Sequence, residues 1–407
     1  MHGKSLSPLL YCTGSLFVVN DGVRRGHFHG TIFHQPFTRL SLFRHRFRTV
    51  LAVKSSLRRA QQRRALDGCG PFSRNTILTR GKGSLQKALD KGHLAVKMAP
   101  FFPVINTGIA TFCKAPFVFD PAAIEADIAI LGVPFDGMAS MRPGCRQAPR
   151  ALREASARFG WLGEPGGSRG FFDIGSGRIL LAGQRMVDAG DVDVSLDDGI
   201  TRERITDHAR RILASGALLA SIGGDHSVSF PLISAFERYG PLTVVLVDAH
   251  LDYRDVFLGL KFTNNSPFRR VRELPFVKRI VTVGARGLKS TNAEYMDSLR
   301  HGNLIFTAEA VADRGAASIA AEIGDLGSYY VSLDIDGLDP SIAPGTESPE
   351  ASGLTFRQAR DLLRALGRQG KPVGVDLVEV NPYLDHAELT QHISVQLLIE
   401  ALASKGA

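Results

Sequence analysis

VVLVDAHLDYRD, residues Val244 to Asp255, is an aliphatic run that continues directly into a cluster of aspartates and a histidine. In an extended chain alternate side chains point the same way, so Asp248, His250 and Asp252 converge on one spot. The stretch therefore predicts a buried strand whose carboxyl end carries three side chains of the kind that bind metals.

Short apolar runs alternate with longer amphipathic segments from Asp127 to the end of the chain. The predicted strands are residues 126–133, 217–224, 242–250, 279–286, 303–306, 329–336 and 372–380. The predicted helices are residues 205–216, 231–240, 291–302, 316–327, 355–370 and 389–405. Apolar strands separated by helices predict a three-layer α/β/α fold around a mostly parallel sheet. Ligands of such sheets bind outside the carboxyl ends of the strands, where the acids of this sequence lie.

Residues 1–97 differ in composition from the rest of the chain. They hold 18 of the 49 Lys and Arg but only three of the 40 acids, so they carry +15 while residues 98–407 carry −6. Three explanations compete: a mis-called start codon with translation from Met98, an organellar transit peptide, and a basic arm that binds nucleic acid. We favour the first and expect residues 1–97 to be an unstructured extension before one domain, residues 98–407.

Cysteines and hydrophobicity exclude other classes of protein. The four cysteines show no CxxC spacing, which indicates free thiols and neither a disulfide scaffold nor a zinc–cysteine site. No stretch of about 18 or more apolar residues is present, so we expect no transmembrane helix. Since the positive charge lies in residues 1–97, we expect no nucleic-acid partner for the remaining domain.

Three predicted strand ends carry the chemistry. They are SIGGDHS (221–227), DAHLD (248–252) and VSLDIDGLDP (331–340). Together they offer four aspartates and two histidines, namely His226, Asp248, His250, Asp252, Asp334 and Asp336. Carboxylate and imidazole without thiolate suit manganese, and to a lesser degree zinc, nickel or iron. Six ligands exceed the needs of one tetrahedral ion and fit two, which can lower the pKa of a shared water from about 15.7 toward about 7.

Each motif alone has an ordinary structural explanation. GGDHS is compatible with a strand-to-helix turn capped by Asp225, and DAHLD with solvated loop charge. DIDGLDP is compatible with a turn closed by Pro340. Because all three motifs lie at predicted strand ends, we favour a common functional site over these separate structural explanations.

GGDHS, DAHLD and SLDIDGLDPSIAPGT, in this order, resemble the ureohydrolase family, the manganese enzymes that include arginases and agmatinases. The resemblance extends from about Asp127 to Leu402, including LGVPFDGMASMRPGCRQAPRALREAS (131–156) and MVDAGDVDV (186–194). It implies an arginase-like fold, a catalytic domain in residues 98–407, and a homo-oligomer, usually a trimer or hexamer. It places Glu379, in VGVDLVEVNPYLD (373–385), where the family holds the substrate guanidinium.

The resemblance also implies roles for the six ligands. One manganese ion would be bound by His226, Asp248, Asp252 and Asp334. The other would be bound by Asp248, His250, Asp334 and Asp336, so Asp248 and Asp334 would bridge. The hypothesis is that a bridging hydroxide attacks the guanidinium carbon and Asp252 passes a proton to the departing amine, giving urea. The expected catalytic residues are Asp252 and Glu379.

Two segments depart from the family pattern. In KFTNNSPFRR (261–270) Asn264 stands where many relatives have a histidine, and an amide cannot relay protons near neutral pH. In GTESPEASGLT (345–355) Glu347 and Glu350 stand where relatives have an uncharged loop. Both departures bear on the choice of substrate, and we count Asn264 among the expected substrate-binding residues.

The sequence says less about the tail of the substrate than about its guanidinium group. DAHLDYRD and the SPFRR loop resemble agmatinases more than arginases, so we expect agmatine, cleaved to putrescine as in polyamine biosynthesis. Its cationic tail would favour acids, with Asp255, Glu347 and Glu350 as candidates. The next candidates are 4-guanidinobutyrate and 3-guanidinopropionate, whose carboxylate would favour arginines such as Arg254, Arg269 and Arg270. An ordinary solvated loop is the alternative for all these charges.

Two other classes are less favoured. A one-zinc deacetylase of the same fold would have a catalytic histidine pair, which is missing here, while His226 and Asp252 are retained. A regulatory relative without activity would be expected to lose ligands, and all six are present. We expect a cytoplasmic enzyme, or a mitochondrial one if residues 1–97 are a transit peptide.

Overall fold

The computed structural model describes residues 108–159 and 170–404. Within them, eight strands form one sheet in the order β4-β1-β5-β10-β9-β6-β7-β8, and every neighbouring pair is parallel. The predicted boundary near residue 98 and the three explanations for residues 1–97 lie outside the described residues and stay predictions.

All seven predicted strands are confirmed as members of this sheet. Their bounds, with the additional edge strand β4, are β1 Ile128–Gly132, β4 Met186–Asp191, β5 Leu218–Ile222, β6 Leu242–Val247, β7 Val277–Ala285, β8 Leu304–Thr307, β9 Gly327–Asp334 and β10 Gly370–Val378. β5 and β6 are buried along their whole length, as both faces of a parallel sheet are covered by helices. The expected three-layer fold is therefore confirmed.

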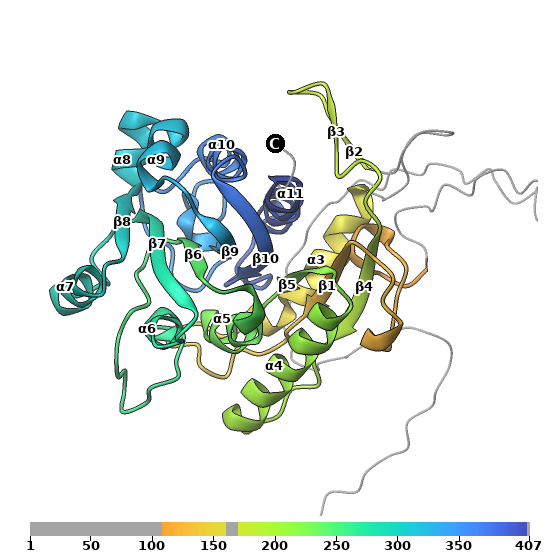
Figure 1. Ribbon diagram of the computed structural model, residues 1–407, viewed down its shortest axis with the longest axis horizontal. Helices are drawn as coiled ribbons and strands as arrows, with labels where there is room; N and C mark the ends of the chain where they lie inside the picture. Colours follow the sequence, from red (N-terminus) through yellow and green to blue (C-terminus); the bar gives the residue numbers. More distant parts are fainter. Residues whose placement is uncertain (1–107, 160–169, 405–407) are drawn as a thin grey trace, which may run out of the picture. The chain divides into compact units, whose positions relative to one another are not determined.

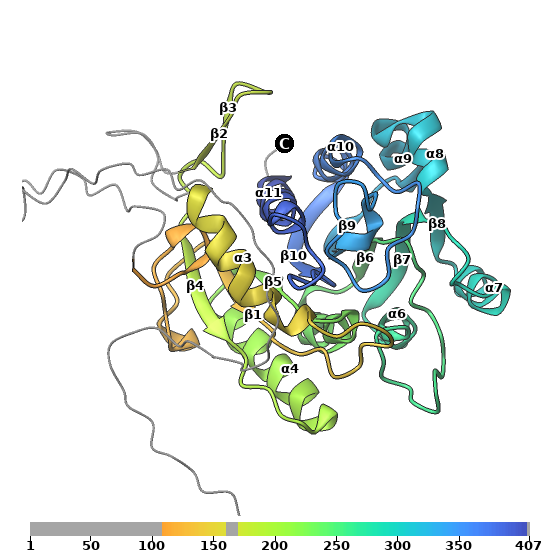
Figure 2. The same cartoon turned by 180° about the vertical axis from the view of Figure 1, so that it is seen from behind.

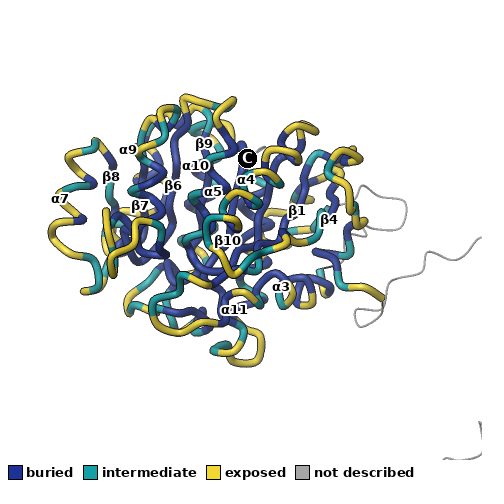
Figure 3. Tube along the Cα trace, turned by 90° about the horizontal axis from the view of Figure 1, so that it is seen from below, coloured by how far each residue is buried: buried dark blue, intermediate teal, exposed yellow. Residues whose placement is uncertain are grey.

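Helices cover both faces of the sheet (Figures 1 and 2). One layer holds α3 Ala148–Ser156, α8 Ala308–Arg314, α9 Ala316–Ile323, α10 Phe356–Leu366 and α11 Leu389–Ala403. The opposite layer holds α4 Asp198–Ala214, α5 Ser229–Ile233 and α6 Pro267–Arg272, while α7 Asn292–Arg300 lies beside β8. The two apolar clusters between helices and sheet leave the strands buried in the centre (Figure 3).

Several elements differ from the prediction. Residues 231–240 were expected to form one helix, but a 3-10 helix, η6 Ser234–Tyr239, follows the short α5. The hydroxyl of Ser234 donates to the carbonyl of Phe230 at 2.8 Å, an interaction that competes with the regular backbone pattern. Some short elements beside loops were not predicted from the sequence. They are α3, α6, α8 and the hairpin of β2 Phe171–Asp173 and β3 Arg178–Leu180.

Among the described helices, none is both long enough and apolar enough to span a membrane.

The four central strands are the ones that deliver functional side chains. β5, β10, β9 and β6 are consecutive in the sheet, and each is followed at its carboxyl end by one of the singled-out motifs. His226 follows β5 and begins the 3-10 helix η5 (His226–Val228), and Glu379 follows β10. The DAHLD segment follows β6, and the aspartates of LDID end β9. Parallel pairing thus brings His226 and Glu379, which are 153 residues apart in the chain, to one edge of the sheet.

Gly224 is required where β5 turns toward His226. A Cβ atom at this position would lie 1.7 Å from the carbonyl oxygen of Phe135, which accepts a 3.0 Å hydrogen bond from the amide of Asp225. The carbonyl of Gly224 in turn accepts from the amide of Glu379 at 2.9 Å. Any side chain here would push the segment of Phe135 away from the turn that presents His226.

We therefore expect Gly224→Ala to destabilise the protein by about 1–3 kcal/mol, the usual cost of overpacking, and to displace His226. The denaturant midpoint and divalent-metal affinity measure the two effects. Gly199→Ala is the matched control, because Gly199 lies in the first turn of α4 and its Cβ would meet only the side chain of Asp197 at 3.1 Å and a more distant arginine. Equal stability and metal affinity in both variants would contradict this account.

Candidate metal centre

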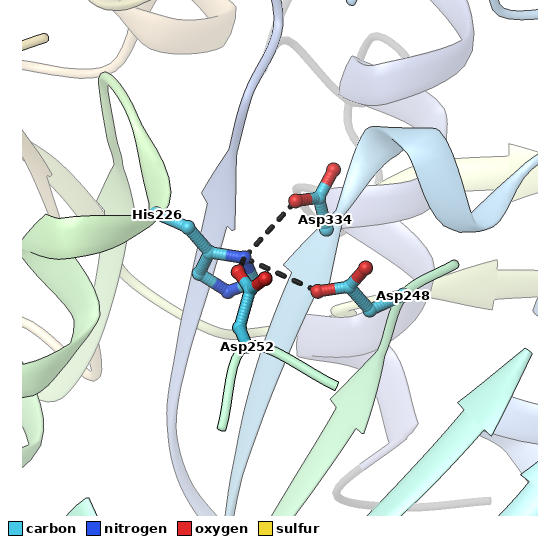
Figure 4. A group of neighbouring side chains, drawn as sticks. All are labelled: His226, Asp248, Asp252 and Asp334. Atoms are coloured by element: carbon cyan, nitrogen blue, oxygen red, sulfur yellow. Dashed lines mark ion pairs between the residues drawn. The ribbon is translucent and has the colours of Figure 1, made fainter. Parts of the chain in front are cut away.

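Three carboxylates surround one imidazole nitrogen (Figure 4). Nδ1 of His226 lies 3.2 Å from Asp248 Oδ2, 3.1 Å from Asp252 Oδ2 and 3.0 Å from Asp334 Oδ2. These four side chains come from the ends of β5, β6 and β9, and all are buried. Their ligand atoms lie within 4.8 Å of one another, so one ion can contact all four.

A second group adjoins the first and shares Asp248. His250 Nδ1 lies 3.1 Å from Asp336 Oδ2 and 3.5 Å from Asp248 Oδ1. Asp248 thus turns one oxygen to each group, as a bridging carboxylate does. All six residues named from the sequence are brought together in this way, in two groups of four and three.

Asp334 differs from the arrangement expected from the resemblance. The structure places it in the first group, while its other oxygen accepts the amide N–H of Asp336 at 2.8 Å. That hydrogen bond closes the short turn η7 (Ile335–Gly337). Its expected role as a second bridging carboxylate stays a prediction.

The tautomer of His226 is set by a buried hydrogen-bond relay. The Ser332 hydroxyl donates to Asp376 Oδ1 at 2.6 Å, so its oxygen accepts from His226 Nε2–H at 3.0 Å. Tyr330 donates to the other oxygen of Asp376 at 2.9 Å. With a proton held on Nε2, Nδ1 is the ring nitrogen that faces the three carboxylates and that is available to bind a metal.

The electrostatics of the cluster favour positive charge. Burial and two neighbouring aspartates raise the pKa of Asp334 well above its usual value, and burial with Asp248 raises the pKa of Asp252. Burial would raise the pKa of Asp248 too, but the two histidines lower it. Burial would lower the pKa of His226, but the three carboxylates raise it well above its usual value. Four buried carboxyl groups this close require cations or protons among them.

The donor set fits divalent cations. It consists of carboxylate oxygen and imidazole nitrogen, without a thiolate, and three of its atoms have no hydrogen-bond partner although they are buried: His226 Nδ1, Asp248 Oδ2 and His250 Nε2. Polar atoms that are buried and unpaired are costly in proteins, and a cation contacting the first two would satisfy them. The described residues thus offer two adjacent groups that could each hold a divalent cation.

Glu379 lies beside this cluster and is positioned by its backbone. It adopts a left-handed conformation with φ of 61°. Its carboxylate accepts the amide N–H of His226 at 2.8 Å and the thiol of Cys145 at 3.4 Å. Burial, with the charges of Asp334, Glu347 and Asp225, raises the pKa of Glu379 well above its usual value. The environment of this carboxyl is therefore short of positive charge.

Asn264 and Glu347, the two departures from the family pattern, lie against each other. Both are buried, and the Asn264 amide donates to Glu347 Oε2 at 3.4 Å. The other oxygen of Glu347 accepts from the amide of Met141 at 2.7 Å and the hydroxyl of Ser140 at 3.1 Å. Glu347 thus ties the segment after β1 to the segment after β9, and Asn264 supports it.

The remaining residues expected to bind the substrate tail are occupied elsewhere. Arg254 pairs with Glu294 at 3.2 Å, and Asp255, whose side chain is 62% exposed, pairs with Arg270. Arg269 pairs with Glu273 and Asp297. Glu350 is nearer to the cluster, with Oε1 at 3.7 Å from His250 Nε2.

Several residues around the candidate metal centre were not predicted from the sequence. Ser332 precedes Asp334 by two positions on β9, so strand alternation already places both on one face. Cys145 and Asp376 carried no comparable signal. Lys289, in the loop after β7, also escaped notice, although loops at carboxyl ends of parallel strands are where ligands bind.

Comparisons with known proteins agree with this geometry. The model of the arginase family matches residues 126–404. A mitochondrial guanidino acid hydrolase of Homo sapiens is 34% identical over 314 residues, which cover 75% of this chain and 85% of that protein. A mitochondrial agmatinase of Gallus gallus is 36% identical over 304 residues, which cover 72% of this chain and 85% of that protein.

A solved structure gives the same result. The proclavaminate amidino hydrolase of Streptomyces clavuligerus superposes with a TM-score of 0.66 and 32% identity, covering 74% of this chain and 98% of that one.

The relay behind His226 generates a prediction. Ser332→Ala removes the acceptor of Nε2–H, so we expect divalent-metal affinity to fall about 10- to 100-fold, the usual effect of such outer contacts. Titration of the metal-depleted protein with Mn²⁺ measures this. Ser221→Ala is the matched control, because Ser221 is equally buried on β5, which β10 separates from β9, and its hydroxyl has no hydrogen-bond partner among the described residues. If the two alanine variants bind Mn²⁺ equally well, the relay does not orient His226.

Proposed function

The chain belongs to the arginase family, and from this premise we propose that its buried cluster holds two manganese ions and that it hydrolyses a guanidino compound to urea and an amine. The family makes it a hydrolase of amidine groups. The observation that carries the finer proposal is the pair of ligand groups that share Asp248. A single structural ion would need only one of them.

Each side chain of the cluster has a defined part in the proposal. One ion would be held by His226, Asp252 and Asp334 and the other by His250 and Asp336, while Asp248 belongs to both ligand groups. Bound there, the two ions would supply Lewis-acid charge and lower the pKa of a water molecule enough to make it a nucleophile near neutral pH. The relay through Ser332 keeps the proton of His226 on Nε2, away from the ligand atom.

Glu379 is the proposed anchor for the guanidinium. A guanidinium stays protonated throughout the physiological range and pairs best with a carboxylate. Glu379 is buried next to the cluster, and its two short contacts, from His226 N–H and the Cys145 thiol, leave lone pairs on both oxygens. Those contacts hold the carboxylate in one orientation, which restricts where the guanidinium carbon can lie.

Asp252 is the proposed proton carrier. Its Oδ2 lies 3.1 Å from His226 Nδ1 in the first group, and burial together with Asp248 raises its pKa. A carboxylate in this position accepts a proton from the attacking water and donates it to the departing amine. Asn264 takes no part in this transfer, since its amide does not titrate and it is engaged with Glu347 and Asn265.

The proposal also concerns the identity of the substrate and the cellular compartment of the enzyme. The sequence favoured agmatine through two loop resemblances, and the relatives include both an agmatinase and a guanidino acid hydrolase. Those two relatives are named as mitochondrial, which suits a transit peptide within residues 1–97, and we keep cytoplasm and mitochondrion as the alternatives. The homo-oligomer implied by the resemblance also stays a prediction.

Urea release by the full chain tests the proposal. We expect Mn²⁺-dependent urea from one or more of agmatine, 4-guanidinobutyrate, 3-guanidinopropionate and arginine. Chelation of the metal should abolish it, and added Mn²⁺ should restore it. Urea formation that persists after chelation would contradict the metal-centred proposal. Absence of urea from all four compounds would contradict hydrolysis of these guanidino compounds.

Glu379→Gln tests the anchor. Glutamine keeps the size of the side chain and an acceptor for His226 N–H but loses the charge, so we expect kcat/KM to fall about 10- to 100-fold, the range for a hydrogen bond to a charged group. Metal content should stay at the wild-type level. Glu309→Gln, at an exposed position in α8, is the control. An unchanged kcat/KM in Glu379→Gln would reject the role of anchor.

A further inference from the structure

Lys289 lies in the loop that follows β7, and neighbouring segments hold this loop in place. The guanidinium of Arg254 donates to the carbonyl of Lys289 at 3.1 Å while its Nε pairs with Glu294. The amide of Leu251 donates to the hydroxyl of Ser290 at 3.4 Å. Arg254, expected from the sequence to bind a substrate tail, thus fixes the backbone of Lys289 against the metal-binding segment after β6.

The side chain of Lys289 extends toward the loop after β9. Its Nζ donates to the hydroxyl of Ser348 at 3.0 Å, and Ser348 lies one residue after the buried Glu347. Arg286 secures the two loops to each other, since it donates to the carbonyls of Asp336 at 2.8 Å and Glu350 at 2.7 Å. The ammonium is therefore held between two loops that border the cluster.

The ammonium of Lys289 has more N–H donors than its hydrogen bond to Ser348 uses. An ammonium offers three N–H groups, and Ser348 takes one. Among the described residues Lys289 forms no ion pair, although its side chain is only partly exposed. Burial would lower the pKa of Lys289, but the charges of Asp252, Asp336 and Glu379 raise it above its usual value, so the ammonium stays charged.

The acids named for an ammonium tail are less suited to their task. Asp255 is paired with Arg270 and largely exposed. Both oxygens of the buried Glu347 have protein donors. Glu350 remains partly exposed, with its carboxylate near His250. The aspartates of the cluster are the proposed metal ligands and Glu350 lies beside His250, so Lys289 is the charge that we assign to a substrate tail.

We infer that Lys289 binds the carboxylate tail of the substrate, which makes the preferred substrate a guanidino acid in place of the agmatine expected from the sequence. This inference rests on the proposed function. Glu379 follows β10 and Lys289 follows β7, so a negative and a positive charge flank the metal-binding segments after β9 and β6. Such a pair of charges is complementary to a guanidinium and a carboxylate on one molecule. Agmatine, a dication, would place its ammonium against that of Lys289.

The test compares 4-guanidinobutyrate with agmatine. Both carry the guanidino group on a four-carbon chain, and they differ in the charge at the other end of that chain. Wild type should have the higher kcat/KM for 4-guanidinobutyrate. Lys289→Met should lower that kcat/KM about 10- to 100-fold, mainly through KM, and raise the kcat/KM for agmatine. Lys289→Arg, which keeps the charge, should restore most of the loss. Binding of the products gives a readout other than turnover: Lys289→Met should weaken 4-aminobutyrate and not putrescine.

Lys278→Met is the control, because Lys278 is exposed near the amino end of the same strand β7 and should change neither substrate. A preference of the wild type for agmatine, or equal effects of Lys289→Met on both substrates, would overturn the inference and leave the proposed function standing. Absence of urea from every guanidino compound would instead remove the proposed function on which the inference rests.

Discussion

The mutual repulsion of four buried aspartates is the constraint on which the rest of this structure depends. Asp248, Asp252, Asp334 and Asp336 are each at most 6% exposed, and two histidines lie among them. Such a group is unfavourable in a protein interior unless cations compensate it. The fold therefore makes a site that is incomplete by itself, and binding of divalent ions would be linked to its stability.

Parallel pairing is what makes the cluster possible. β5, β10, β9 and β6 are neighbours, so the residues after them converge although they are far apart in the chain. The loops are then fixed by contacts that avoid the ligand atoms. Examples are the close packing of Gly224 on Phe135 and the hydrogen bonds of Arg286 to loop carbonyls. The site is built on rigid elements, as metal centres require.

Much of this was predictable because its signals are local. Apolar runs identify seven of the eight strands of the sheet, and alternation at the ends of β6 and β9 aligns Asp248 with His250 and Asp334 with Asp336. Strands that alternate with helices predicted the three-layer fold, and the motifs at three strand ends, GGDHS included, predicted the six residues. The bounds of helices were harder, since α4 begins at Asp198, seven residues before the predicted start, where its N-cap Asp197 lies in a polar segment.

What could not be predicted depends on contacts across the sheet edge. Arg254 and Asp255 belong to the conspicuous DAHLDYRD stretch, yet they pair with Glu294 and Arg270 from other segments. Asn264 and Glu347 are 83 residues apart and meet only in the folded chain. Lys289 stands in a loop without any pattern, and its relation to Ser348 appears only when the loops after β7 and β9 are seen together.

The number of manganese ions bound per chain tests the central claim most directly. Equilibrium dialysis of the metal-depleted full chain against Mn²⁺, followed by elemental analysis, counts them. Two ligand groups that share Asp248 predict two ions per chain. A saturating value of one, or no binding, would contradict the account of the cluster as a two-metal centre.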